Sequence, residues 1–105
     1  MVKRGEIWLI NLDPIGSEIQ KTRPCVLISP AELNDNLRTV IVAPITSTGF
    51  ATPFRVPVMH GGKKGFIVLD QLRTVDKQRL IKKMGRLHAK TLSTALAALQ
   101  DVFAE

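Results

Sequence analysis

The chain has 105 residues, 45% of them hydrophobic and 23% charged, with a formal net charge of +6. This length and balance predict a single globular domain over residues 1–105 and exclude a multidomain, disordered or low-complexity protein. The N-terminal apolar run is too short for a signal-peptide core and no run approaches a membrane span, so we expect a cytoplasmic protein without membrane contact.

Two strands are predicted at the N-terminus. Apolar and polar residues alternate over residues 6–12, which predicts a strand that Asp13 and Pro14 end. The run RPCVLIS, residues 23–29, predicts the second strand. Pro24 is tolerated near its start because a strand end can spare the N–H that proline lacks.

A central strand and a hairpin are expected next. After one predicted helical turn over residues 31–36, the run TVIVAPI at 39–45 is apolar on both faces, which is typical of a central strand. Residues 54–58 alternate cleanly, and the turn HGGKK leads into GFIVLD at 65–70, which predicts a hairpin. Pro57 favours an edge position for its first strand.

The C-terminal third is predicted to contain a strand and a helix. Residues 71–74 could prolong the preceding strand, and we assign 82–86 to a further strand. The tail has helical spacing, which predicts an amphipathic helix that docks by its apolar stripe. That stripe comprises Leu92, Ala95, Leu96, Leu99, Val102 and Phe103. Short strands with one terminal helix predict a mainly β protein, a small and strongly bent antiparallel sheet or barrel with a C-terminal α-helix.

Most enzyme signatures are missing from the sequence. It has no glycine-rich phosphate loop, no nucleophile elbow and no clustered metal ligands, so we expect no cofactor and no metal site. Cys25 is the only cysteine and is predicted to be inert packing in an apolar strand. His60 and His88 are interpreted as surface or capping residues rather than catalysts.

The positive charge lies in the second half of the chain. Residues 1–52 carry five basic and five acidic residues, whereas residues 53–105 carry ten and four. The segment 77–90 has six basic residues and no acidic one, which indicates either a polyanionic or acidic partner or a solvated basic surface.

Polar residues at the ends of predicted strands form a candidate site. Arginine beside hydroxyl and amide groups indicates phosphate chemistry, because a guanidinium can bind two phosphate oxygens at once. The stretch GSEIQKTRPCVLIS, residues 16–29, is therefore either a solvated loop or part of this site. The candidates facing one rim are Glu18, Arg23, Thr46, Ser47, Asp70, Gln71 and Arg73.

Several motifs carry a family resemblance over nearly the whole chain. In order they are GEIWLINLDP, GSEIQKTRP, PITS, LDQLRTVDKQRL and GRL before the final helix. This series resembles the MazF/PemK family of toxin endoribonucleases from toxin-antitoxin pairs. The resemblance implies an SH3-like barrel, a homodimer and sequence-selective, metal-independent cleavage of single-stranded mRNA, which inhibits translation and growth. It also implies an acidic antitoxin whose tail occupies the RNA groove, with DNA contacted only indirectly through that antitoxin.

The resemblance assigns roles to individual residues. Arg23 and Thr46 match the principal catalytic pair of the family, and Glu18, Gln20 and Ser47 match positions that line its groove. Some branches place a basic residue where this chain has Val68, which puts more of the charge stabilisation on Arg23. The resemblance also implies supporting or RNA-binding roles for Asp70, Gln71 and Arg73. Asp70 is either catalytic or holds its loop in place. Arg73 either binds RNA or forms an ion pair with Asp70 or Asp76.

The chemistry implied is attack of a ribose 2′-OH on the adjacent phosphorus, leaving a 2′,3′-cyclic phosphate and a 5′-hydroxyl. Arginine gives up a proton poorly because its pKa exceeds about 12, so the sequence leaves open whether Glu18, Arg23 or water accepts the 2′-proton. Two other functions stay open: a non-catalytic barrel toxin of the topoisomerase-inhibitor kind, and a plain RNA-binding barrel.

Overall fold

A computed structural model describes residues 1–12 and 21–105. The predicted strand end at Asp13 and Pro14, and the candidate residues Glu18 and Gln20, lie outside the described residues. The strands are β1 (Glu6–Asn11), β2 (Thr22–Leu27), β3 (Thr39–Thr46), β4 (Arg55–His60), β5 (Lys63–Val68), β6 (Arg73–Asp76) and β7 (Leu80–Arg86). The helices are α1 (Ala31–Asn34), α2 (Ala89–Phe103) and the short 3₁₀ turns η1 (Leu69–Gln71) and η2 (Lys77–Arg79).

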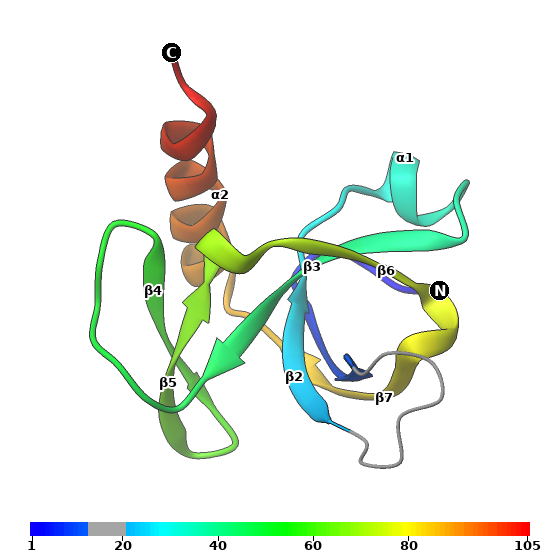
Figure 1. The fold of residues 1–105 in the computed structure, drawn as a ribbon, viewed down its shortest axis with the longest axis horizontal. Helices are drawn as coiled ribbons and strands as arrows, with labels where there is room; N and C mark the ends of the chain where they lie inside the picture. Colours follow the sequence, from blue (N-terminus) through cyan, green and yellow to red (C-terminus); the bar gives the residue numbers. More distant parts are fainter. Residues whose placement is uncertain (13–20) are drawn as a thin grey trace.

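The described strands form one curled antiparallel sheet in the order β4-β5-β3-β2-β1-β7, with β6 paired to β3 (Figure 1). β3 is central, because β2 and β6 pair with it and β5 pairs with its last residues. β4 lies at an end of this order, so the edge position indicated by Pro57 is confirmed. The predicted bent antiparallel sheet with a C-terminal helix is therefore confirmed.

The curl gives the sheet two apolar cores, one on each face. Alternate residues of β2 point to opposite sides, so Val26 packs in one core and Cys25 and Leu27 pack in the other. β3 divides in the same way, with Ala43 and Ile45 on one side and Val40 and Val42 on the other. Burial on both faces explains why these two strands read as continuous apolar runs.

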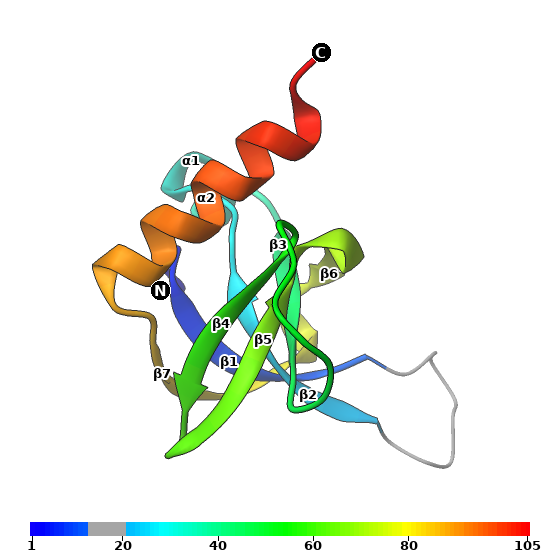
Figure 2. The same cartoon turned by 90° about the vertical axis from the view of Figure 1, so that its left-hand side faces the viewer.

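Helix α2 covers the first of these cores. It lies across one end of the sheet next to β4 (Figure 2). Four residues of the predicted docking stripe do pack there, since Ala95 and Leu99 are buried against strand residues and Leu92 and Leu96 lie beside them. Val102 and Phe103 do not, because both are exposed. The last turn projects beyond the sheet and leaves Phe103 74% exposed.

The β4–β5 hairpin and the segment after it differ from the prediction. The turn is only Gly61 and Gly62, because both have positive φ (58° and 77°) and so form the tight turn that matches strand twist. β5 consequently begins at Lys63 and ends at Val68, so Asp70 belongs to η1 rather than to a strand. The strand does not continue over residues 71–74, a possibility that the sequence left open, because η1 interrupts it and β6 pairs with the other half of β3.

Two buried polar groups hold connections in place. Asn34 is 2% exposed; its Nδ2 donates to the Ser29 carbonyl at 2.8 Å, and the Ser29 hydroxyl in turn accepts the Ile41 N–H at 3.0 Å. Glu6 is 4% exposed and accepts the Lys3 N–H at 2.8 Å and the Trp8 indole N–H at 3.1 Å. A salt bridge of 2.9 Å to Lys83 ties Glu6 to β7.

Candidate active site between β2, β3 and the β4–β5 hairpin

Antiparallel pairing brings the start of β2 to the end of β3. The register pairs Cys25 with Pro44 and Leu27 with Val42. The pairs end at Cys25, and the same register extended by two residues would bring Arg23 opposite Thr46. The two residues that the family resemblance singles out therefore lie at the same end of these paired strands, although they are 23 residues apart in the sequence.

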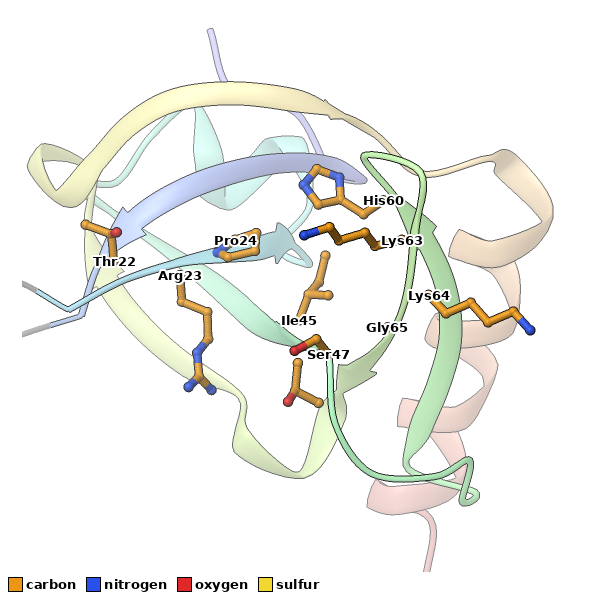
Figure 3. A pocket seen from close by; sticks show the side chains of 10 residues that line it. Thr22, Arg23, Pro24, Ile45, Ser47, His60, Lys63, Lys64 and Gly65 are labelled. Carbon is orange, nitrogen blue, oxygen red and sulfur yellow. The ribbon is translucent and has the colours of Figure 1, made fainter.

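A cavity of about 310 Å³ opens at this point (Figure 3). β2 contributes one wall, the end of β3 the floor, and the β4–β5 hairpin the opposite wall. Among the described residues that line it, the charged ones are all basic, which suits an anionic ligand. The lining residues are Thr22, Arg23, Pro24, Ile45, Thr46, Ser47, His60, Lys63, Lys64 and Gly65.

Arg23 contributes a guanidinium to this cavity. Its side chain is exposed and makes no ion pair or side-chain hydrogen bond with the described residues. Its backbone is held, because the Arg23 carbonyl accepts the Cys25 thiol at 3.6 Å and Pro24 follows in the strand. Burial raises the pKa of the Cys25 thiol to about 12 despite nearby Arg23 and Arg73, so the predicted role of Cys25 as inert packing is confirmed.

Thr46 presents a hydroxyl whose direction is partly fixed. Its Oγ1 accepts the Thr48 N–H at 3.3 Å and lies 3.2 Å from the Thr48 Oγ1. The Thr48 N–H occupies one acceptor position on Thr46 Oγ1, and either hydroxyl can be the donor in the contact between the two threonines. The Thr46 proton is available to a bound oxygen when the Thr48 hydroxyl is that donor. Ser47 adds a second, exposed hydroxyl at the same edge of the cavity (Figure 3).

Gly65 allows β5 to pass close to Thr46. A Cβ at this position would lie 2.8 Å from the Thr46 carbonyl oxygen and 3.2 Å from Ile45 Cγ2. Its φ is not in the positive range, so the requirement is for space rather than for backbone freedom. The absence of a side chain at Gly65 therefore helps to set the position of Thr46.

The predicted rim residues Asp70, Gln71 and Arg73 are not among the described residues that line the cavity. Asp70 forms a two-pronged ion pair with Arg55, with Nε to Oδ1 at 3.3 Å and Nη2 to Oδ2 at 3.4 Å. The Arg55 hydrogen bond lowers the pKa of Asp70. This pair ties η1 to the start of β4, which favours a loop-holding role for Asp70. Gln71 and Arg73 are exposed on η1 and β6 and are not brought to Thr46.

Sequence reasoning did not assign the hairpin residues His60, Lys63 and Lys64 to the cavity. His60 is half-buried at the end of β4 and pairs with Lys63 across the turn. The only signal available was the Gly61-Gly62 turn. It predicts that the residues on either side of the turn face each other, but it does not predict that they face β2 across a cavity. His88, by contrast, occupies the N-cap position of α2 without a capping side-chain hydrogen bond.

Neither a metal centre nor a membrane span is evident in residues 1–12 and 21–105. In these residues, no three histidine, cysteine, aspartate or glutamate side chains lie close enough together to bind a metal ion. No helix in the same residues is both long and apolar enough to cross a membrane.

The fold and the cavity together define a class of protein: a small, curled β-sheet domain with a pocket that could bind a phosphodiester. The pocket is lined by cationic and hydroxyl groups, which are suitable hydrogen-bond donors to phosphate oxygens. Comparison with known sequences makes this specific. The chain belongs to the family of PemK-like, MazF-like toxins of type II toxin-antitoxin systems, whose sequence profile matches residues 3–103.

Individual relatives agree with that assignment. The chain is 37% identical over 108 residues to the endoribonuclease PemK of Escherichia coli, covering 96% of this chain and 81% of the relative. It is 32% identical over 112 residues to the endoribonuclease MazF9 of Mycobacterium tuberculosis, covering 95% and 94%. A mycobacterial endoribonuclease solved in complex with its cognate antitoxin superposes with a TM-score of 0.81 at 20% identity, over 96% of this chain and 93% of that one, which establishes the shared fold.

Proposed function

We propose that this toxin is a metal-independent endoribonuclease that cleaves single-stranded RNA at the pocket between β2, β3 and the β4–β5 hairpin. The observation that carries the proposal is the convergence of Arg23 and Thr46 on a cavity with several basic lining residues. Family membership and the endoribonuclease names of the relatives support it.

The proposed reaction is a transesterification within the RNA. The 2′-oxygen attacks the adjacent phosphorus, the bond to the 5′-oxygen breaks, and the products are a 2′,3′-cyclic phosphate and a 5′-hydroxyl. The 2′-proton leaves as the nucleophile attacks, and the departing 5′-oxygen takes up a proton. Negative charge grows on the non-bridging oxygens in between.

Arg23 and Thr46 suit that charge. The guanidinium can donate two N–H groups to two phosphate oxygens, and the Thr46 hydroxyl can donate one O–H while Thr48 holds its oxygen. Donors that are already in place when charge develops are each worth roughly 100- to 1000-fold in rate. Ser47 is placed to contact the same phosphate or its ribose.

The test is incubation of the protein with a long single-stranded RNA in EDTA. Arg23→Ala and Thr46→Ala should each fold and cleave at least roughly 100-fold more slowly. Arg38→Ala is the matched control, because it removes an equal charge from an exposed arginine just before β3, at the far end from Thr46. Intact RNA with wild-type protein, or equal rates for the Arg23 and Arg38 variants, would reject the proposal.

An acidic antitoxin is the proposed protein partner, acting on this chain in the cytoplasm. A toxin of this family is one half of a toxin-antitoxin pair, and the basic lining of the cavity suits an acidic segment. Competition should follow: an acidic antitoxin peptide should displace RNA, and added salt should weaken both. Simultaneous binding of peptide and uncleavable RNA without mutual weakening would refute a shared site.

We also propose a homodimer, although α2 contributes less to it than the sequence suggested. Four of the six residues of the α2 stripe pack in the chain's own core, while exposed apolar side chains remain at β4 and the residues before it, on β7 and at the end of α2. Met59 is 61% exposed on the edge strand β4, and Phe54, just before that strand, is 43% exposed. Sedimentation at micromolar concentration should give a dimer, and a charged Met59→Lys variant should dissociate it; a monomeric wild type would contradict the idea.

A further inference from the structure

The tip of the β4–β5 hairpin presents His60 and Lys63 to the cavity from the side opposite Arg23 (Figure 3). The two residues are a cross-strand pair, held facing each other by the tight Gly61-Gly62 turn. In Figure 3 the Lys63 side chain extends from β5 toward Pro24, beside the His60 ring. This hairpin tip is thus a second cluster of potential hydrogen-bond donors in the same cavity.

These side chains are uncommitted, in contrast to other cations of the fold. Lys83 is paired with Glu6 and Arg55 with Asp70, whereas Lys63 has no ion pair or side-chain hydrogen bond among the described residues. An ammonium without a partner at a cavity wall keeps its full capacity to bind an anion.

The spacing indicates that Lys63 does not share the phosphate of Thr46. β5 pairs with Thr46 at Phe66, three residues beyond Lys63. At about 3.3 Å per residue, the two backbone positions lie roughly 10 Å apart. The Lys63 side chain also extends toward Pro24 (Figure 3), so its ammonium and the Thr46 hydroxyl enter the cavity from different elements, the hairpin and the end of β3. A strand of RNA that crosses the cavity would meet the two clusters at successive phosphates.

We propose that Lys63 and His60 form a second phosphate subsite, which holds the RNA backbone next to the scissile phosphate; this rests on the proposed function. Lys63 supplies the charge and the His60 ring an N–H donor. The subsite fixes how the strand runs from the β2 start toward the hairpin, since a phosphodiester held at two points has a defined direction and register.

Lys64 provides a matched control. It is adjacent in β5, equally charged and also exposed. It borders the cavity as well, but neighbouring residues of a strand point to opposite faces, and the Lys64 side chain extends away from the cavity (Figure 3). Lys63→Ala and Lys64→Ala therefore remove the same charge from the same strand and differ only in the face from which it is lost. Substitutions of exposed lysines change stability by less than about 0.5 kcal/mol, so both variants should fold.

The experiment measures binding of a fully 2′-O-methylated RNA oligonucleotide, which cannot be cleaved, at a series of salt concentrations. One lost phosphate contact to a single strand lowers the slope of log affinity against log salt by about 0.7. Lys63→Ala should show that decrease and Lys64→Ala should not. His60→Phe should keep the slope but bind roughly 2- to 10-fold more weakly, as expected for one lost hydrogen bond.

Equal slopes for the two lysine variants would overturn the Lys63 assignment, and unchanged affinity of His60→Phe would remove His60 from it. Cleavage of ordinary RNA by the wild-type protein is measured in parallel. It separates failure of the proposed subsite from failure of the proposed endoribonuclease activity. An active wild type with equal slopes rejects the subsite alone, whereas an inactive wild type rejects the endoribonuclease proposal.

Discussion

Gly65→Ala tests whether close packing of β5 positions the Thr46 hydroxyl. The new Cβ would lie 2.8 Å from the Thr46 carbonyl oxygen, whereas ordinary contacts begin near 3.4 Å, so a shift of 0.6 Å between the two backbones is needed to restore an ordinary contact. Misplacement of a reacting group by about 1 Å can cost roughly 100-fold, which sets an expected loss of roughly 10- to 100-fold in cleavage rate. Overpacking of this kind also destabilises the fold by about 1–3 kcal/mol.

The assay is single-turnover cleavage of RNA well below the melting temperature, with the melting temperature measured on the same preparation. Gly85→Ala is the control, because its φ of 146° strains an L residue while nothing lies within 4 Å of the new Cβ, and β7 does not line the cavity. It should lose stability and keep its cleavage rate. A Gly65→Ala protein with both wild-type stability and wild-type rate would show that Thr46 is positioned by something else.

Three further predictions concern single side chains. Arg23→Lys should recover little of the activity lost in Arg23→Ala, because an ammonium keeps the charge but not the two-pronged contact; full rescue in the RNA assay would argue for charge alone. Burial by itself raises the pKa of Glu6, yet hydrogen bonds from Lys83, the Lys3 backbone and Trp8 leave it below the ordinary value of about 4.3. The ionised Glu6 therefore contributes its full stabilisation above that pH, and this contribution is lost as the pH falls through the lower folded pKa. The free energy of unfolding in urea should consequently depend less on pH below about 4 for Glu6→Gln than for the wild type. Parallel pH profiles for the two proteins would contradict this. Asn34→Ala should lower the free energy of unfolding by about 1–3 kcal/mol in a thermal melt, because it leaves buried polar groups of Ser29 without a partner. Asn36→Ala removes a hydrogen bond at an exposed site and should cost far less. Equal losses of stability in the two variants would contradict this reasoning.

The elements that the sequence predicted correctly are those whose signal is local. The α2 stripe is a helical period over three turns, and Pro57 excludes an interior strand position because of its missing N–H. The break after Val68 carries no such signal. It exists because β3 is long enough to pair with β5 at one end and β6 at the other, which is a property of the whole sheet.

The same distinction applies to the site. Arg23 and Thr46 could be named from motifs, and their meeting follows from strand register. His60 and Lys63 could not be named, because the curl of the sheet decides that the hairpin tip faces the start of β2 (Figure 1). Asp70 was placed on the rim from its motif, but its geometry is governed by Arg55, which no motif marked.

The order in which the strands enter the sheet has a consequence for synthesis of the toxin. Arg23 and Thr46 both lie in the first half of the chain, yet the strand that packs against Thr46 and the hairpin wall of the cavity come later, and the helix that covers the core comes last. Since long-range strand pairing must wait for its partners, a nascent chain on the ribosome holds both residues without the cavity that organises them.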